Sequence, residues 1–539
     1  MKPHPDRFDP GGSETRILKT SPIFPCMNRE NQTLQTLAGV LNPVQFQGEG
    51  HHLVKSLTTD SRRVIPGSLF FALPGLRTDG NFFTEEAIDR GAVGIVTEQA
   101  KVSHRKIATL QVESVHSALA AASRHFFGDP ASRLPVIGIT GTNGKTTVAH
   151  LAQHLLAEKE QPVGLIGTIR YDVGRRTFPS FKTTPESVDV YAMLAQMEEA
   201  GCGEAVMEIS SHGIHQRRVE GLQLDIAVFL NLTQDHLDYH GDLESYFECK
   251  TRIFTGRHGQ PLPGSALINR DDPRAIRLLG AIPESVEVQT FGLNPHAGLR
   301  AEAISMDPEG THFTIVGSGE EHRVRTPLLG SYNVSNTLAA LSIGLARGRN
   351  LREMVERLRD FPGVPGRMER IDSGQPFQVL VDYAHTDDAL RNAIGMLRPL
   401  VNGTLRVVFG CGGNRDREKR PLMTRAVLDG ADVAYLTADN PRKEAVAKIL
   451  DDMEDALKPG ESARVRRIED RRQAIRRALL DAEAGDCVLI AGKGHESFQE
   501  FSDTLVPFDD RAVARELLNL SQRAEQHPGK VTNRATTGD

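Results

Sequence analysis

The chain has 539 residues, which is too long for one hydrophobic core and leads us to expect about three or four domains. Hydrophobic residues make up 39% and charged residues 25% of the sequence, a composition that excludes a largely disordered chain. The formal net charge of -6 excludes a strongly basic protein, so we expect no nucleic-acid partner.

The five cysteines lie far apart and form no CxxC pair, so they predict neither a disulfide framework nor a cysteine-bound zinc site. No stretch approaches the roughly 18 apolar residues that a membrane helix needs. Residues 1–31 lack the apolar core of a secretory signal, and we interpret them as a flexible extension. We therefore expect a cytoplasmic protein without membrane insertion.

Short apolar runs alternate with a helical pattern in residues 32–130, which predicts a small α/β domain. The predicted strands are 67–73 and 94–97, and the predicted helix is 114–126. Pro130 and Pro135 interrupt the chain before the next apolar strand, so we place a domain boundary at residue 131.

A central domain is predicted over residues 131–365. The apolar strand 136–140 runs into a glycine-rich loop, which is followed by apolar residues at helical spacing. Further buried strands are predicted at 204–209 and 225–230, separated by helical sequence. This alternation is typical of a parallel-rich sheet, so we expect an α/β ATPase domain of the P-loop type.

A cluster of proline and glycine at 361–366 precedes a third set of apolar strands. These strands are predicted at 377–381, 405–409, 433–437 and 487–490. They predict a C-terminal Rossmann-like α/β domain over residues 366–520. Residues 521–539 are polar and without periodicity, and we interpret them as a flexible tail.

The glycine-rich loop of the central domain predicts a phosphate site. It consists of Gly141, Thr142, Asn143, Gly144, Lys145, Thr146 and Thr147. In such a loop, backbone N–H groups surround phosphates, the lysine reaches the outer phosphate and the following hydroxyl ligates magnesium. Ile139 stands where the usual pattern has its first glycine, so the loop is a variant, and a chance glycine-rich turn is the alternative. We expect ATP and Mg²⁺ here.

Polar residues at strand ends are candidate magnesium ligands beside this loop. Glu208 ends one predicted strand and opens a polar segment, and His236 follows Asp235 just beyond the next strand. A histidine after a strand is more often a surface residue than a ligand. Only its combination with Glu208 and the loop makes His236 a candidate.

Several motifs together resemble the Mur ligases of peptidoglycan synthesis. In the central domain they are G-T-N-G-K-T-T at 141–147, M-E-I-S-S-H-G at 207–213 and N-L-T-Q-D-H-L-D-Y-H at 231–240. Downstream motifs resemble the diaminopimelate-adding members: G-S-Y-N-V-S-N at 330–336, D-Y-A-H-T at 382–386, G-C-G-G-N-R-D at 410–416, D-N-P-R at 439–442 and G-K-G-H-E at 492–496. The resemblance spans residues 50–515.

This resemblance implies an ATP-dependent ligase with an N-terminal domain for the UDP end of its substrate, a central ATPase domain and a C-terminal amino-acid domain. ATP would phosphorylate the glutamate of UDP-N-acetylmuramoyl-L-alanyl-D-glutamate, and an amine of meso-diaminopimelate would attack the acyl phosphate. Lys145 and magnesium would screen the repulsion between the anions. These small molecules are the expected partners, and we expect a monomer.

The resemblance also implies roles for individual residues. Lys250 occupies the place of a family lysine that is carbamylated and binds a second magnesium. The implied catalytic residues are Lys145, Glu208, His236 and Lys250, and the metal ligands are Thr146, Glu208, His236 and carbamylated Lys250. The implied contacts to the UDP-muramoyl dipeptide are Thr59, Ser61, Leu76, Arg77, Thr78, Thr183, Thr184, Ser210, Gln216 and Arg218. A plain turn is the alternative for the first five of these.

Asn336 resembles the family's adenine contact, although an asparagine-rich helix start is an alternative. Diaminopimelate differs from lysine by a second carboxylate, so a selective pocket needs a cation, and Arg442 supplies it. The implied diaminopimelate contacts are Arg415, Asp439, Asn440, Pro441, Arg442, Gly492 and Glu496. A turn before a helix is the alternative reading of the D-N-P-R motif.

Two departures from the family pattern leave the local loop geometry open. Asp387 stands where the family has proline, and Ala445 and Val446 replace a proline-bearing stretch. We interpret His385 as structural. The rival functions are a folylpolyglutamate synthase, a lysine-adding Mur ligase, and a P-loop protein that uses ATP only to switch a partner-binding surface.

Overall fold

The computed structural model describes residues 32–75, 78–99, 107–317, 319 and 321–526. The chain separates into two compact units, of which one contains residues 32–362 and the other residues 363–526. Within the described ranges, no helix is long and apolar enough to cross a membrane. The predicted extension at 1–31 lies outside the described residues.

The first unit begins with a five-stranded sheet in the order β1-β5-β4-β3-β2, in which β1 is antiparallel and the other strands are parallel. Its strands are β1 (Gln45–Gln47), β2 (Ser56–Thr58), β3 (Ser68–Phe71), β4 (Ala92–Thr97) and β5 (Ala108–Gln111). Its helices are α1 (Leu34–Leu41), η1 (Ser61–Arg63), η2 (Gly80–Phe83), α2 (Thr84–Asp89) and α3 (Val115–Phe126). The predicted strands and helix of this α/β region are confirmed.

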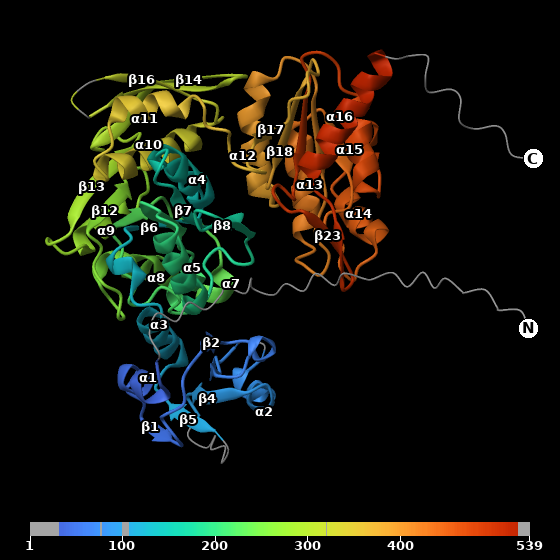
Figure 1. Cartoon of the computed structure of the whole chain (residues 1–539). Helices are drawn as coiled ribbons and strands as arrows, with labels where there is room; N and C mark the ends of the chain where they lie inside the picture. Colours follow the sequence, from blue (N-terminus) through green and yellow to red (C-terminus); the bar gives the residue numbers. More distant parts are fainter. Residues whose placement is uncertain (1–31, 76–77, 100–106, 318, 320, 527–539) are drawn as a thin grey trace, which may run out of the picture. The chain divides into compact units, whose positions relative to one another are not determined.

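The same unit continues with an eleven-stranded sheet in the order β16-β15-β14-β13-β12-β11-β6-β10-β7-β8-β9 (Figure 1). Its strands are β6 (Val136–Thr140), β7 (Val163–Ile166), β8 (Arg170–Asp172), β9 (Thr177–Pro179), β10 (Glu204–Glu208), β11 (Ile226–Phe229), β12 (Ser265–Asn269), β13 (Glu287–Gly292), β14 (Leu299–Asp307), β15 (Gly310–Val316) and β16 (His322–Thr326). The six neighbouring strands β13-β12-β11-β6-β10-β7 of this order pair in parallel, which confirms the parallel-rich sheet.

Helices accompany this sheet, and the elements that matter for the site are α4 and α10. The helices are η3 (Pro130–Ser132), α4 (Lys145–Leu156), α5 (Ser187–Glu199), α6 (Ser211–His215), α7 (Leu237–His240), α8 (Leu243–Thr255), α9 (Ala275–Ala281), α10 (Ser331–Ala346) and α11 (Leu351–Leu358). Strand β6 pairs with β10 on one side and β11 on the other. The carboxyl ends of three parallel strands therefore meet beside the loop that starts α4, where open α/β sheets bind ligands.

The second unit contains a six-stranded sheet in the order β17-β18-β22-β19-β20-β21, parallel except for β17, and a separate β23-β24 hairpin. Its strands are β17 (Glu369–Arg370), β18 (Gln378–Asp382), β19 (Leu405–Phe409), β20 (Val433–Leu436), β21 (Val465–Arg467), β22 (Cys487–Ala491), β23 (Phe498–Phe501) and β24 (Thr504–Pro507). This parallel sheet confirms the predicted α/β fold of the C-terminal region.

Helices of the second unit complete its α/β layers. They are α12 (Asp387–Leu397), η4 (Arg398–Leu400), α13 (Lys419–Gly430), α14 (Val446–Glu454), η5 (Glu461–Arg464), α15 (Arg471–Leu480) and α16 (Asp510–Gln526). Helix α16 includes residues 521–526, which fall within the predicted tail, and the flexibility of that tail stays a prediction. The rest of the predicted tail, 527–539, lies outside the described residues.

Candidate active site

The phosphate loop is held in place at the end of strand β11. The backbone N–H of Asn143 donates to Asn231 Oδ1 at 2.9 Å, and Asn231 Nδ2 donates back to the Asn143 carbonyl at 3.1 Å. Lys145 Nζ lies 2.8 Å from both the Gly141 and the Thr142 carbonyl oxygens. The loop is therefore held by Asn231, and its lysine donates to carbonyl oxygens of the loop itself.

Glycine is required at position 144 by the close approach of helix α10. Gly144 has φ 89, and a Cβ there would lie 2.4 Å from Asn336 Oδ1. Asn336 is buried and donates from Nδ2 to Asn333 Oδ1 at 2.9 Å, while Asn333 donates to the Leu329 carbonyl. The structure thus places Asn336 against the phosphate loop, whereas Asn333 is bound within its own segment.

Glu208 is fully buried at the end of strand β10 and contacts the hydroxyl of the phosphate loop. Its Oε2 accepts hydrogen bonds from Thr146 Oγ1 and Thr168 Oγ1, both at 2.9 Å, and its Oε1 accepts from the Thr168 N–H at 2.8 Å. A buried carboxylate is costly unless such donors or a cation compensate its charge. Thr168 is not among the predicted site residues, because no sequence motif distinguishes it.

Lys250 is also fully buried and lies beside the same loop. Its Nζ is 2.9 Å from the Gly141 carbonyl oxygen and 4.6 Å from the centre of the Tyr246 ring. Burial and then the positive charge of Lys145 hold the pKa of the Lys250 amine well below its ordinary value. The environment thus favours an uncharged, nucleophilic amine.

His236 occupies a more exposed position at the start of α7. It has φ 53, and its Nε2 lies 3.4 Å from Asp235 Oδ2. Its ring packs 4.7 Å from that of His212, and the rings of His236 and Tyr246 are 6.3 Å apart. The structure thus places His236 beside His212, and its role as a metal ligand stays a prediction.

The residues implied for the muramoyl dipeptide converge beside Glu208. Thr184 Oγ1 donates to the Glu208 carbonyl and accepts from the Ser210 N–H, both at 2.9 Å. Thr183 Oγ1 lies 3.0 Å from Thr168 Oγ1. Arg218 Nη1 donates to the Thr184 carbonyl at 2.8 Å, and its Nη2 donates to Gln216 Oε1.

The residues implied for the uridine end are less well assembled. Leu76 and Arg77 lie outside the described residues, and Thr78 is exposed. Ser61 is buried and donates to Glu86 Oε2 at 2.6 Å, and Thr59 directly follows strand β2. Ser61 therefore has a structural partner, and a ligand role for these residues stays a prediction.

In the second unit, a buried polar network joins two predicted substrate motifs. Lys493 Nζ is fully buried and donates to Asn440 Oδ1 at 3.0 Å and to Glu496 Oε2 at 2.8 Å. Asn440 Nδ2 donates to Glu496 Oε2 at 3.0 Å. Burial raises the pKa of the Glu496 carboxyl, but the Lys493 charge and these hydrogen bonds outweigh it, so the net pKa shift is downward.

Arg442 has an unusual backbone conformation that the β23-β24 hairpin holds in place. It has φ 53, its N–H donates to the Glu500 carbonyl at 2.9 Å, and its own carbonyl accepts from the Ser502 N–H at 2.6 Å. Its Nε donates to Glu500 Oε2 at 3.0 Å, and its Nη1 donates to the Gly413 carbonyl at 2.9 Å. Two of the three guanidinium nitrogens, Nε and Nη1, are therefore held by protein acceptors.

The glycines around Arg442 explain two of the sequence motifs. A Cβ at Gly413 would lie 1.8 Å from the Pro441 carbonyl oxygen, so only glycine allows this close approach. A Cβ at Gly492 would lie 2.8 Å from Asp439 Oδ2, a buried atom without a hydrogen-bond partner among the described residues. Arg415 is exposed on the neighbouring loop.

Arg471 is a further positioning residue that the sequence analysis missed. It is fully buried, and its Nε and Nη2 each lie 2.7 Å from the carboxylate of Asp510, also fully buried. Its Nη2 also donates to the Ala491 carbonyl at 2.9 Å, and its Nη1 to the Ala438 carbonyl at 3.3 Å. Arg471 thus connects the segments that follow β20 and end β22. The D-N-P-R and G-K-G-H-E motifs come next in the chain.

The first unit has the fold and loop of a nucleotide-dependent phosphoryl-transfer enzyme, with a buried carboxylate beside the phosphate-loop threonine. Three family models match the chain: the Mur ligase family catalytic domain at 53–127, the Mur ligase middle domain at 139–344 and the Mur ligase glutamate ligase domain at 366–494. The chain belongs to the Mur ligase family and is an ATP-dependent ligase.

Curated relatives include UDP-N-acetylmuramoyl-L-alanyl-D-glutamate--2,6-diaminopimelate ligases. The protein of Geobacillus thermodenitrificans is 43% identical over 487 residues, which cover 89% of this chain and 98% of the relative. That of Solibacter usitatus is 44% identical over 466 residues, covering 86% of this chain and 93% of the relative.

Solved structures show the same similarity. A UDP-N-acetylmuramoyl-L-alanyl-D-glutamate--2,6-diaminopimelate ligase structure has a TM-score of 0.66 and 33% identity, covering 92% of this chain and 100% of that chain. The folylpolyglutamate synthase of Mycobacterium tuberculosis, with a TM-score of 0.55 and 21% identity, covers 70% of this chain and shares only the fold.

Proposed function

We propose that this chain joins meso-2,6-diaminopimelate to the D-glutamate of UDP-N-acetylmuramoyl-L-alanyl-D-glutamate, converting ATP to ADP and phosphate. The observation that carries this choice of amino acid is Arg442, whose guanidinium is fixed by Glu500 and Gly413 beside the buried network around Lys493. The names of relatives at 43% and 44% identity support the same substrates.

The chemistry begins with activation of the glutamate carboxylate, which is a poor electrophile. Its oxygen takes the γ-phosphoryl group of ATP, and ADP leaves. An amine of diaminopimelate then attacks the carbonyl carbon of the acyl phosphate, and the tetrahedral intermediate loses phosphate and a proton to give the amide. Lys145 and the N–H groups at the start of α4 stabilise the phosphate charge.

Thr146 and Glu208 fit a magnesium site, because their oxygens lie 2.9 Å apart and Glu208 has a buried charge that a cation would compensate. His236 is the proposed third ligand, and Asn336 the proposed adenine contact. Magnesium would supply charge screening between the phosphates and the carboxylate. The proposed second ion would be held by Lys250 in carbamylated form.

Carbamylation of Lys250 is supported by its environment. An uncharged amine attacks the carbon of CO₂, an N–C bond forms, and the amine proton goes to solvent. Burial and the charge of Lys145 lower the pKa of the amine and so favour its reactive form. The product is an anion with oxygen atoms that can bind magnesium, which the unmodified amine does not have.

Diaminopimelate selectivity follows from the groups around Arg442. Its Nε and Nη1 each have a protein acceptor, which orients the Nη2 edge for a carboxylate of the amino acid. Lysine lacks this carboxylate and would leave the guanidinium without its partner. We propose that Arg415, Asp439, Asn440, Pro441, Gly492 and Glu496 make the remaining contacts.

The sugar-peptide substrate is proposed to bind in the first unit. The residues Thr183, Thr184, Ser210, Gln216 and Arg218 would contact the dipeptide, and Thr59, Ser61 and Thr78 the uridine end. We further propose domain limits at 32–130, 131–365 and 366–520, a monomeric state and a cytoplasmic location. The monomeric state rests on the family resemblance, and the location on the scattered cysteines.

Phosphate release measured with one substrate omitted at a time tests the function. We expect release only when ATP, the UDP-muramoyl dipeptide and diaminopimelate are all present, because the amine is needed for turnover of the acyl phosphate. Release that continues unchanged without the dipeptide or diaminopimelate would rule out the ligase function and favour a nucleotide switch.

A further inference from the structure

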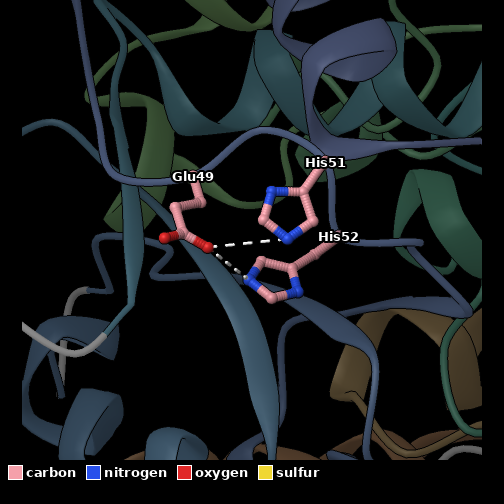
Figure 2. A group of neighbouring side chains, drawn as sticks. All are labelled: Glu49, His51 and His52. Carbon is pink, nitrogen blue, oxygen red and sulfur yellow. Dashed lines mark ion pairs between the residues drawn. The ribbon is translucent and has the colours of Figure 1, made fainter.

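The loop between β1 and β2 brings three potential metal ligands together on the surface of the first unit. Figure 2 shows the side chains of Glu49, His51 and His52 converging from this loop. Glu49 Oε2 lies 3.5 Å from His51 Nε2 and 3.7 Å from His52 Nε2. Nothing in the proposed ligase chemistry uses these residues.

The spacing of these atoms fits a zinc-type ion. With metal–ligand bonds of about 2.0–2.2 Å, tetrahedral ligand atoms lie about 3.3–3.6 Å apart. Two separations in the structure are 3.5 and 3.7 Å, and all three ligand atoms lie within 4.8 Å of one another. Small rotations of exposed side chains would therefore complete the coordination.

The backbone of this loop is held by the start of helix α1. The Leu34 N–H donates to the His52 carbonyl and the Gln35 N–H donates to the Gly50 carbonyl, both at 2.9 Å. A Cβ at Gly50 would lie 2.5 Å from Gln35 Oε1, so the packing is close. The three ligands thus start from a fixed backbone, which lowers the entropy cost of binding an ion.

Ordinary surface ion pairs are the alternative explanation, and exposed pairs of this kind contribute only about 0–1 kcal/mol. Such a pair needs one imidazole for one carboxylate. Here two imidazole nitrogens approach the same oxygen atom, Glu49 Oε2, and the two rings lie 4.5 Å apart. Convergence of two imidazoles and one carboxylate is what a shared cation favours.

We propose that Glu49, His51 and His52 bind one divalent zinc-type ion, with water in the remaining positions. Two imidazole nitrogens favour zinc over magnesium and calcium, which prefer oxygen ligands. Three protein ligands and an open position are the usual composition of a non-structural zinc site. The inference does not depend on the proposed ligase function.

Zinc titration of the full chain by calorimetry tests this site. The test variant is the double substitution His51→Ala with His52→Ala, and the matched control is His296→Ala, an exposed histidine in another loop. We expect wild type and control to bind one more Zn²⁺ per chain than the double variant. The difference isolates this site from other histidines, such as His212 and His240.

Equal zinc stoichiometry and affinity in wild type and the double variant would overturn the proposal. Glu49→Gln provides a second measurement that retains both imidazoles. Loss of an outer-shell partner of a metal ligand costs about 10–100-fold in metal affinity. Glu49→Gln removes a direct ligand, so we expect it to weaken zinc binding at this site by at least this factor. Unchanged affinity in this variant would also contradict the assigned ligand set.

The ligase assay with Mg²⁺ separates this proposal from the proposed function. The double variant should release phosphate at the wild-type rate, since none of its changed residues contacts the phosphate loop. A wild-type rate together with the lost zinc site is the expected combination. Zinc retained by the double variant overturns the metal site whatever the ligase assay shows.

Discussion

Two lysines converge on one backbone carbonyl in the phosphate loop. Lys145 Nζ lies 2.8 Å and Lys250 Nζ 2.9 Å from the Gly141 oxygen. Two charged ammonium groups beside the same oxygen would repel each other. The lowered pKa of Lys250 favours its uncharged form and so relieves this repulsion. The pair thus combines the phosphate-loop lysine with a second lysine whose pKa is lowered.

Replacing Lys250 by Arg tests this division of roles. A guanidinium cannot be carbamylated and keeps its charge, so we expect kcat for phosphate release to fall about 100-fold or more, the usual effect of losing one electrostatic stabiliser. Lys159→Arg, an exposed lysine of the same unit, is the matched control. A Lys250→Arg enzyme with wild-type kcat would contradict the carbamate.

Glu500 orients Arg442, and this role gives a second prediction. In Glu500→Gln the guanidinium loses its charged partner, so we expect the KM for diaminopimelate to rise about 10-fold or more while the KM for ATP stays unchanged. Asp503→Asn, in the turn of the same hairpin and 86% exposed, is the control. An equal rise in both KM values would indicate a general folding defect.

Site residues that lie in distinctive local motifs could be predicted from the sequence. Residues from distant segments that hold them in place could not. The phosphate loop and the D-N-P-R motif are visible in the sequence because glycine, proline and charge occur at short spacing. Thr168 and Glu500 act through contacts with residues far away in the sequence, and threonine and glutamate are common everywhere. His236 lies in a clear motif, and its role as a metal ligand beside Thr146 and Glu208 stays a prediction.

At the scale of elements, the Arg471–Asp510 pair joins helices α15 and α16 to the ends of two strands. Breaking a fully buried ion pair costs about 3–5 kcal/mol, because the remaining charge stays unpaired. We expect Arg471→Met to lower the free energy of unfolding by this amount in chemical denaturation.

The neighbouring Arg472 is a matched control for that measurement. It pairs with Glu516 at the surface, with side chains 37% and 54% exposed, so Arg472→Met should cost only about 0–1 kcal/mol. Equal destabilisation by the two substitutions would show that the buried pair has no special role in holding the strand ends.

Helix α5 contributes a pH-dependent contact within the first unit. Asp189 is buried 3.5 Å from Arg63 of η1, and burial, only partly offset by Arg63, raises the pKa of its carboxyl to about 6. The folded state therefore holds a proton more tightly than the unfolded chain. This contribution to stability is present below the ordinary value of 3.8 and is lost as pH rises through about 6.

Replacing Asp189 by Asn removes this titration. Relative to wild type, we expect Asp189→Asn to gain about 2–3 kcal/mol of stability between about pH 4 and pH 8, since asparagine never ionises. Thermal unfolding at several pH values measures the difference. A stability difference that does not change with pH would show that Asp189 titrates normally.

Elements were predicted best where both faces of a strand are buried. The runs at 136–140 and 405–409 match β6 and β19, because every residue in them is buried. The sequence did not show the antiparallel extension β14 to β16 or the β23-β24 hairpin. Their strands have an exposed face, so their apolar residues alternate and form no continuous run.

For the whole molecule, the phosphate loop and Arg442, the proposed selectivity residue, lie in separate compact units. Arg442→Lys should therefore lower the preference for diaminopimelate over lysine, measured as kcat/KM with each amino acid, by about 10–100-fold, the value of one carboxylate–guanidinium pair. The affinity for ADP should stay the same. Parallel losses in ADP affinity and amino-acid preference would argue against this separation.

The hairpin that holds Arg442 also determines when the chain can acquire the amino-acid selectivity proposed for this residue. The left-handed backbone at Arg442 depends on the Glu500 carbonyl and the Ser502 N–H, which follow about 60 residues later. During synthesis from the N-terminus, the phosphate loop is complete long before these partners leave the ribosome. A nascent or truncated chain ending before residue 498 would therefore carry its nucleotide loop without the residue geometry that distinguishes one amino acid from another.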